Sequence, residues 1–194
     1  MAILQTKRLV LRKLRRSDLD DFYEYSSDPN VGPNSGWQPH EDKRHSRFVM
    51  RENFLYNNFA WGIIFDNKLI GTVSVDTDRK RMNNRVMSIG YSMSSKFWGK
   101  GIMSEAVSGV LEYMFDTYEI DAISVYCYPE NSRSRRVIEK CGFEFEGLQY
   151  MAQLRYDGKV MDNLCYLLTQ EHYNEVRGKL PMFDDVRNES AGNA

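Results

Sequence analysis

Apolar residues recur at every second position in several stretches of the chain, and this spacing predicts β-strands. The predicted strands cover residues 7–14, 59–65, 69–76, 85–93, 122–128, 143–156 and 162–169. Two pairs of these runs are joined by short polar turns, Asp66-Asn67-Lys68 and Asp157-Gly158, which predict hairpins. The three runs between 59 and 93 follow one another without a helix, so they predict an antiparallel meander.

Apolar residues spaced three or four positions apart predict helices elsewhere. Shorter helices are predicted over 17–28, 41–57 and 132–141, with Phe48 on the apolar face of the second. Residues 30–39, rich in glycine, proline and asparagine, predict an exposed loop. Strands outnumber helices and the hairpins come first, so the pattern predicts an α+β fold around a mixed, mostly antiparallel sheet. The one long helix carries on a single face Met103, Ala106, Val107, Val110, Leu111 and Met114.

The composition fits one folded domain. The chain has 194 residues, of which 42% are hydrophobic, and this is enough for a single core. We expect one domain over 1–180 and a flexible tail over 181–194. The net charge is −1, without the basic excess of a nucleic-acid-binding protein. No apolar run reaches the roughly 18 residues of a membrane helix and no leader pattern opens the chain, so a cytoplasmic protein without nucleic-acid or membrane partners is expected.

The cysteines and histidines do not indicate a metal or a disulfide site. Cys127, Cys141 and Cys165 are odd in number and form no CxxC pair, and the three histidines are scattered along the chain. The thiols are therefore expected to be reduced and mostly buried, and no metal is predicted.

The segment Lys96-Phe97-Trp98-Gly99-Lys100-Gly101 lies between a predicted strand and the long helix. Two glycines one residue apart allow successive backbone N–H groups to face inward, and the helix N-terminus adds its dipole, so the segment suits a bound phosphate. An ordinary strand-to-helix turn explains the same residues. A Walker loop and a dinucleotide fingerprint are excluded, because the glycine spacing of neither is present.

A second informative segment, Asn131 to Phe143, follows the next predicted strand. By itself it is a basic amphipathic helix that Asn131 caps and Gly142 ends. Together with the glycine segment, it resembles the GNAT superfamily of acetyl-CoA-dependent N-acetyltransferases, and most of all its RimJ/RimL-like branch. The resemblance covers about residues 3–175 and rests on Lys96-x-x-Gly99-x-Gly101, Trp98-Gly99 followed by Ser104-Glu105-Ala106, Asn131-x-x-Ser134, Gly142-Phe143, Glu146-Gly147, Asp157-Gly158 leading to Asp162 and Tyr166, and the opening Thr6-Lys7-Arg8-Leu9-Val10-Leu11-Arg12.

This resemblance implies a GNAT-type sheet that splays at the acetyl-CoA site, and metal-free transfer of an acetyl group to a primary amine. The glycine segment would bind the pyrophosphate, the preceding strand would pair with the pantetheine arm, and a bulge near Ile89–Tyr91 would direct an N–H towards the thioester carbonyl. Asn131 would hydrogen-bond the pantetheine, or only cap its helix. The implied coenzyme-binding residues are Ile89, Gly90, Tyr91, Met93, Lys96, Trp98, Gly99, Lys100, Gly101, Ile102, Met103, Asn131 and Ser134.

The resemblance also suggests an acid and a base for the transfer. Ser134 matches the serine of the RimL-like branch and is the predicted proton donor to the leaving thiolate, although a small residue there also allows the helix to approach the coenzyme closely. The tyrosine of many GNAT enzymes would stand at Ile138. The glutamate base of the branch would stand at Gln153, which cannot accept a proton. Asp162 is the predicted substitute, and the alternatives are Glu144, Glu24 and a water chain.

The acceptor is expected on the side built from residues 17–56, where the family varies. An acidic cluster there consists of Asp18, Asp20, Asp21, Glu24 and Asp28. Trp37 adds aromatic surface, and Gln153 belongs to the same side. The cluster suits a peptide N-terminus, a polyamine or an amino sugar, and it equally suits a solvated helix start. His40 in this segment is expected to be solvated. Because the glutamate is missing, a non-catalytic acetyl-CoA sensor is the alternative function, and the resemblance leaves a homodimer open.

Overall fold

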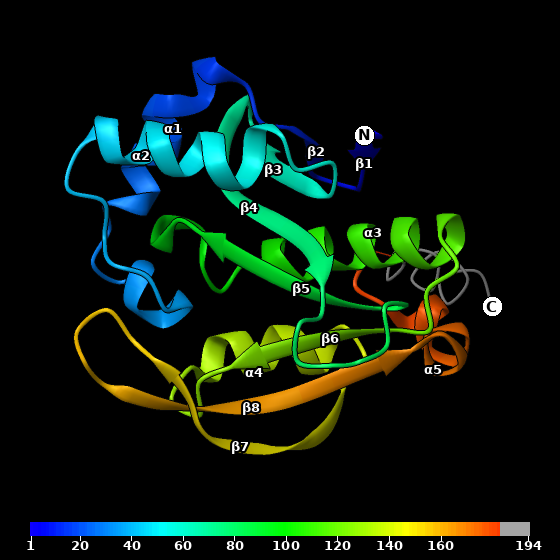
Figure 1. The fold of residues 1–194 in the computed structure, drawn as a ribbon. Helices are drawn as coiled ribbons and strands as arrows, with labels where there is room; N and C mark the ends of the chain where they lie inside the picture. The colour runs from blue at the N-terminus through cyan, green and yellow to red at the C-terminus, as the bar shows by residue number, and fades with distance from the viewer. Residues whose placement is uncertain (183–194) are drawn as a thin grey trace.

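The computed structural model of the chain describes residues 1–182 and contains one eight-stranded sheet flanked by helices (Figure 1). The strands are β1 (Leu4–Gln5), β2 (Val10–Lys13), β3 (Ala60–Phe65), β4 (Lys68–Thr77), β5 (Val86–Met93), β6 (Ala122–Cys127), β7 (Glu144–Leu154) and β8 (Val160–Thr169). The α-helices are α1 (Leu19–Ser26), α2 (Lys43–Met50), α3 (Ile102–Thr117), α4 (Ser132–Lys140) and α5 (Gln170–Val176). Short 3-10 turns are η1 (Arg16–Asp18), η2 (Gly32–Ser35), η4 (Ser95–Phe97) and η5 (Arg177–Lys179), and η3 (Arg51–Leu55) is π-helical.

The sheet has the order β1-β2-β3-β4-β5-β6-β8-β7, and each neighbouring pair is antiparallel except β5 with β6. β5 and β6 pair only through residues 86–88 and 122–124. Beyond this short ladder the two strands continue to Met93 and Cys127 without pairing to each other, so the sheet forks (Figure 1). The predicted α+β class, the mostly antiparallel sheet and its splay are confirmed.

The hairpin of β3 and β4 shows why the local sequence folds as predicted. Asp66 and Asn67 form its turn with φ angles of 48° and 62°. Positive φ at both central residues is the geometry of a type I′ turn, which matches the twist of the flanking strands and favours asparagine and aspartate. The turn therefore sets the pairing of Phe65 with Lys68, and an irregularity between Ile63 and Ile64 shifts the register of the following pairs, which include the buried Trp61 and Ile63.

The apolar core lies on two sides of the sheet. α3 packs its predicted apolar face, from Met103 to Met114, into the larger cluster, and each of the predicted face residues is buried. A smaller cluster joins Phe22 and Met50, from α1 and α2, to β3 and β4. Val31 belongs to this smaller cluster, so the segment between α1 and α2 is tied to the body of the domain by burial worth about 1.5–3 kcal/mol for one such side chain.

Some expectations about the helices and strands differ from the structure. The single strand predicted over 7–14 is replaced by β1 and β2, because Thr6 N–H donates to the Leu9 carbonyl (3.0 Å) and turns the chain. Phe48 is exposed, since α2 directs Ser46 and Met50 inward instead. α5 is absent from the prediction, because its seven residues carry too little apolar periodicity to indicate a helix.

No helix within residues 1–182 is long and apolar enough to cross a bilayer. In this described part of the chain, no group of three or more His, Cys, Asp or Glu side chains could hold a metal ion. Cys127, Cys141 and Cys165 are free thiols. The predicted tail lies outside the described residues from position 183 onwards.

Candidate functional site

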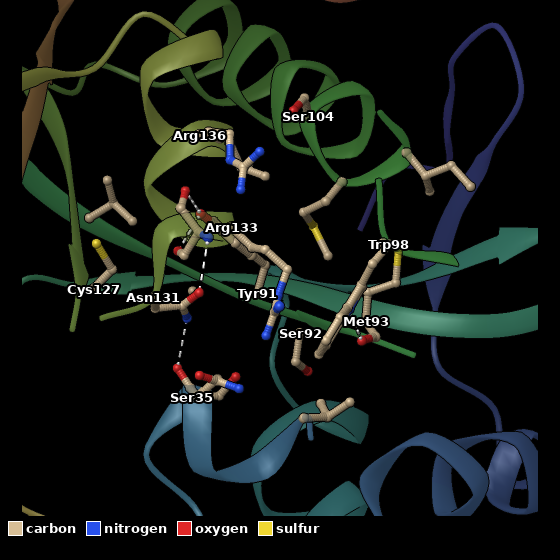
Figure 2. Close-up of a pocket in the computed structure, with 18 of the residues that line it drawn as sticks. Ser35, Tyr91, Ser92, Met93, Trp98, Ser104, Cys127, Asn131, Arg133 and Arg136 are labelled. Carbon is tan, nitrogen blue, oxygen red and sulfur yellow. Dashed lines mark hydrogen bonds between the residues drawn. The ribbon is translucent and has the colours of Figure 1, made fainter. Parts of the chain in front are cut away.

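The fork between β5 and β6 opens into a cavity of about 680 Å³ (Figure 2). β5 lines this cavity with residues 89–93 and β6 lines it with residues 125–127. The loop before α3 and the first turn of that helix form one end, and α4 forms a second wall. Segments far apart in the sequence therefore meet where β5 and β6 stop pairing with each other.

The backbone of β5 pairs with β4 in an unbroken register, so the predicted bulge near Ile89–Tyr91 is wrong. The backbone groups of β5 alternate regularly, and this alternation alone points an N–H into the fork, as the bulge was expected to do. Ser94 N–H donates to the Ile70 carbonyl (2.8 Å), which sets the phase of the ladder. Because an antiparallel strand turns successive backbone groups to opposite sides, Tyr91 directs its N–H and C=O away from β4 and into the fork.

The loop between β5 and α3 forms a backbone cradle. Gly99 and Gly101 have φ angles of 77° and 72°, in the left-handed region that favours glycine. A Cβ added at Gly99 would meet no atom within 4 Å, so the backbone there borders open space. Trp98 anchors the loop, because its Nε1–H donates to the Met93 carbonyl (2.9 Å). Free N–H groups at the start of α3 and the dipole of this 16-residue helix favour an anion here, which fits the pyrophosphate of acetyl-CoA.

α4 presents a stripe of cations to the same cavity. Arg133, Arg136 and Lys140 are spaced three and four residues apart, and all three line it. The Arg133 guanidinium lies 4.2 Å from the centroid of the Trp98 ring, so this side chain crosses from α4 to the cradle (Figure 2). A phosphate-bearing ligand would therefore meet backbone N–H groups on one side and cations on the other.

Asn131 joins α4 to the η2 turn. Its Oδ1 accepts the Ser134 N–H (3.1 Å), and its Nδ2 donates to the Asn34 carbonyl (3.0 Å). Arg155, on the β7–β8 hairpin, donates to the Pro33 carbonyl (3.3 Å). The η2 turn is thus held across one mouth of the fork. Asn131 therefore caps α4, and its contact with pantetheine stays a prediction.

Two hydroxyl groups face each other within the lining. Tyr91 Oη lies 2.9 Å from Ser134 Oγ, and both residues line the cavity. Burial raises the pKa of the Tyr91 phenol well above its ordinary value, so the phenol is protonated at neutral pH. Sequence reasoning assigned Tyr91 only a backbone role, because nothing in a strand pattern indicates which hydroxyl its side chain will reach.

Most of the residues predicted to bind the coenzyme line this cavity. Lys96 and Lys100 do not line it. Lys96 Nζ donates to Glu24 (2.7 Å), and Lys100 Nζ lies 5.3 Å from the centroid of the Phe97 ring. The predicted residues that the structure brings together are Ile89, Gly90, Tyr91, Met93, Trp98, Gly99, Gly101, Ile102, Met103, Asn131 and Ser134.

The acidic cluster predicted to attract the acceptor is held in ion pairs. Glu24 accepts hydrogen bonds from Lys68 (2.5 Å) and Lys96 (2.7 Å), and these two cations lower the pKa of its carboxyl group. Asp18 accepts two hydrogen bonds from Arg12 (2.8 and 2.9 Å). Neither carboxylate lines the cavity. The cluster therefore offers an incoming amine less negative charge than its composition indicates.

The remaining predicted residues also lie outside the cavity lining. Asp162 Oδ1 accepts the Met151 N–H (2.8 Å) at an irregularity of the β7–β8 ladder, where Met151 has a φ of 52°. Gln153 accepts the Tyr128 hydroxyl hydrogen (3.0 Å). Trp37 packs against the cluster beneath α1 and α2.

The expectation of a solvated His40 is wrong. The residue is only 6% exposed, and its Nδ1 lies 2.7 Å from Ser46 Oγ. The ring also packs near His45, with 4.4 Å between the ring centroids. Burial, with a smaller contribution from the His45 charge, lowers the pKa of His40 to about 4. This histidine is therefore neutral at pH 7 and helps to fix the segment that leads from η2 to α2.

Several lining residues were missed from the sequence, and only some carry a signal. The stripe of Arg133, Arg136 and Lys140 is visible as cations at helical spacing on α4. Asn34 and Ser35 line the cavity because η2 folds across the fork, and no local pattern indicates this long-range placement. Tyr126 and Cys127 line the cavity because they lie beyond the residues through which β6 pairs with β5.

The chain is similar to proteins of known family over most of its length. A family model described as an acetyltransferase (GNAT) domain matches residues 8–144. The [ribosomal protein uS5]-alanine N-acetyltransferase of Escherichia coli (strain K12) is 30% identical over 184 residues, which cover 90% of this chain and 94% of that protein.

Solved structures share the overall fold of this chain. A GNAT-family acetyltransferase from Bacillus anthracis has a TM-score of 0.77 at 26% identity, covering 88% of this chain and 99% of that one. A spermidine N-acetyltransferase from Vibrio cholerae, solved with CoA and spermine, has a TM-score of 0.71 at 21% identity, covering 86% of this chain and 98% of that one. The second likeness concerns the fold alone.

Proposed function

This chain belongs to the GNAT acetyltransferase family, and from that membership we propose that it transfers the acetyl group of acetyl-CoA to the α-amine of a peptide or protein N-terminus. One observation carries the proposal. The cavity in the forked sheet combines a backbone cradle, a stripe of cations and a pair of hydroxyl groups around one space. This combination suits an acyl donor that has phosphates at one end and a thioester at the other.

The chain's own residues would hold the coenzyme at three places. The N–H groups from Gly99 to Met103 would bind the pyrophosphate, and Arg136 and Lys140 would face the nucleotide phosphates. The unpaired length of β5 would pair with the amides of the pantetheine arm, because its backbone groups at Tyr91 point into the fork. This placement brings the thioester towards the hydroxyl pair of Tyr91 and Ser134.

The amine nitrogen attacks the thioester carbonyl carbon and forms the C–N bond, the C–S bond breaks, and the sulfur leaves as a thiolate. The nitrogen loses one proton to solvent and the sulfur gains one. Ser134 Oγ–H would give a proton to the thiolate, whose pKa of about 8.5 makes the donor helpful without being essential, and Ser134 would regain a proton from solvent. The Tyr91 N–H, aimed into the fork, is the proposed donor to the developing oxyanion.

Direct attack by the amine is favoured over an acetyl-enzyme intermediate. Cys127 is the one thiol among the residues that line the cavity, and burial raises its pKa to about 11. A thiol with that pKa is protonated at neutral pH, whereas the thiolate is the nucleophilic form. The amine itself is therefore the nucleophile that we propose.

The preference for an α-amine follows from the proton that must leave it. None of the residues lining the cavity, within the described chain, is a carboxylate or a histidine. With no such base at hand, the acceptor must supply its own neutral form. At pH 7.4 about one-fifth of an α-amine with a pKa near 8 is neutral, against about one in a thousand for an alkylamine with a pKa near 10.4.

The charge of the cavity points in the same direction. Arg133, Arg136 and Lys140 are the charged residues of the described lining, and all three are cations. A polyamine or an aminoglycoside would bring several positive charges towards this wall, at a cost that rises with each charge. A peptide N-terminus brings a single titratable amine.

The test is an acetyl-CoA-dependent thiol-release assay on matched acceptors. A library of peptides with free N-termini is compared with the same peptides carrying a formyl cap, and with spermidine and kanamycin. We expect thiol release with free peptides and none with capped peptides. A larger kcat/KM for spermidine or kanamycin would overturn the choice of acceptor, and absence of turnover with every amine would instead favour an acetyl-CoA-binding sensor.

A further inference from the structure

A buried carboxylate stands directly beside the proposed anion site. Glu105 lies in the first turn of α3 and its side chain is 4% exposed. An acidic group at this end of a helix is favourable for the helix dipole, but it competes with a bound phosphate for the same field. Its presence there calls for a specific arrangement of neighbours.

The neighbours come from the start of the chain. Glu105 Oε1 accepts from Thr6 Oγ1 (2.6 Å) and from the Arg8 backbone N–H (2.7 Å). Glu105 Oε2 accepts from Arg8 Nε (2.6 Å). These contacts neutralise the carboxylate charge and satisfy both of its oxygens, so α3 keeps its free N–H groups for an external anion.

Arg8 makes a further contact with the cradle itself. Its Nη1 donates to the Lys100 carbonyl (3.0 Å), while its Nε is held by Glu105. In a planar trans peptide the C=O and the following N–H point in opposite directions. Holding the Lys100 carbonyl on Arg8 therefore aims the Gly101 N–H away from Arg8. Gly101 lines the cavity and Arg8 does not, so the side that faces away from Arg8 is the side of the ligand.

We propose that Arg8 and Glu105 are positioning residues for coenzyme binding: Glu105 holds the Arg8 guanidinium, and Arg8 fixes the peptide between Lys100 and Gly101 with its N–H towards the pyrophosphate. Glycine at position 101 makes this constraint necessary, because a residue without Cβ rotates its peptide planes easily. The inference rests on the proposed use of acetyl-CoA, and it is independent of which amine accepts the acetyl group.

The experiment compares Arg8→Met with a matched control, Arg12→Met. Arg12 belongs to the same N-terminal segment and makes a two-bond ion pair with Asp18, but it has no contact with the cradle. Both substitutions remove an arginine–carboxylate pair, so both are expected to lower the melting temperature. Only Arg8→Met is expected to raise the calorimetric Kd and the KM for acetyl-CoA, by about tenfold or more, with kcat within about threefold of wild type.

Arg8→Lys keeps the test decisive if Arg8→Met does not fold. A lysine neutralises Glu105 as a point charge but lacks the planar fork that reaches the Lys100 carbonyl at the same time. We expect an intermediate Kd for acetyl-CoA. An unchanged Kd in Arg8→Lys or Arg8→Met, or an equal rise in Arg12→Met, would overturn the positioning role. If wild-type protein fails to bind acetyl-CoA, the proposed function fails as well, so the two failures are distinguishable.

Discussion

Tyr91 and Ser134 bring two hydroxyl oxygens to 2.9 Å from opposite sides of the fork, one from β5 and one from α4. The phenol is held protonated by burial, which raises its pKa. The phenol hydrogen has two acceptors here, Ser134 Oγ and, at 3.3 Å, the Ser134 carbonyl oxygen. Donation to Ser134 Oγ leaves the serine hydrogen free to point into the cavity, and this is the arrangement that the proposed proton transfer to a thiolate uses.

Ser134→Ala should lower turnover by about 10–100-fold, within the lower range of general-acid effects. The Kd for acetyl-CoA should change little, because the phosphates bind elsewhere and one neutral hydrogen bond contributes only ~1 kcal/mol. The loss should shrink as pH rises past the thiol pKa, since the leaving group then needs no proton. A pH–kcat profile of wild type and variant measures both effects.

Tyr91→Phe is the companion variant, because it removes the orienting hydroxyl and leaves Ser134 in place. Its loss of turnover should be smaller than that of Ser134→Ala. In the double variant, Tyr91→Phe should add no further loss to that of Ser134→Ala, as expected for residues that act as a unit. Near-normal turnover of Ser134→Ala across the pH range would show that position 134 only permits close packing.

Gly99→Ala should weaken acetyl-CoA binding by at least about tenfold, because its methyl group projects into the open space of the cradle and disturbs its N–H groups. Gly158 provides the control. It has a φ of 81°, close to the 77° of Gly99, and a Cβ there would also meet no atom within 4 Å. Gly158→Ala therefore carries the same backbone strain at the β7–β8 hairpin, away from the cavity lining. Equal Kd values for the two variants by calorimetry would contradict the cradle.

Arg136→Gln should raise the KM for acetyl-CoA about 3–10-fold, a range typical of one partly exposed charge-assisted contact with phosphate. The KM for acetyl-pantetheine, which lacks the nucleotide phosphates, should not change. Arg135→Gln is the control, since Arg135 pairs with Glu139 and does not line the cavity. Steady-state kinetics with both donors decides the matter, and a matching rise for acetyl-pantetheine would count against the assignment.

His40 should make the protein less stable in acid. Its pKa is about 4 when folded and about 6.5 when unfolded, so between these values the unfolded chain binds a proton that the folded protein does not. The stabilisation is therefore complete above pH 6.5 and is lost as pH falls towards 4, by at most about 3 kcal/mol.

Urea unfolding of wild type and His40→Gln between pH 7.5 and 4.5 measures this dependence. The variant should be less stable at pH 7 and should show a shallower decline in acid. A decline of equal slope in both proteins would assign the acid sensitivity to other groups.

The sequence predicted individual helices, strands and turns better than the contacts between them. The apolar stripe of α3 and the turn at Asp66 and Asn67 are set by neighbouring residues, and both have the predicted form. The glycine loop also lies where it was predicted, between β5 and the start of α3, and its binding of phosphate stays a prediction. Local chemistry of this kind is written within a few residues of the chain.

Contacts between residues far apart in the sequence were harder to predict. Glu24 is an acidic residue on a helix in any local pattern, and its neutralisation by Lys68 depends on how α1 packs on β4. Asp162 was expected near the reaction and instead accepts the Met151 N–H, since an irregular ladder brings that amide to it. Such partners are selected by packing and register, which a single sequence does not specify.

The short ladder between β5 and β6 also governs how the molecule can bend. Two leaves of sheet meet along a crease of three residue pairs, and hydrogen bonds from Asn131 and Arg155 to the η2 backbone clasp their open ends. The crease has three residue pairs, whereas seven join β4 to β5 and six join β6 to β8. Among these central strands, a change in the angle between the two leaves therefore disturbs the fewest ladder hydrogen bonds.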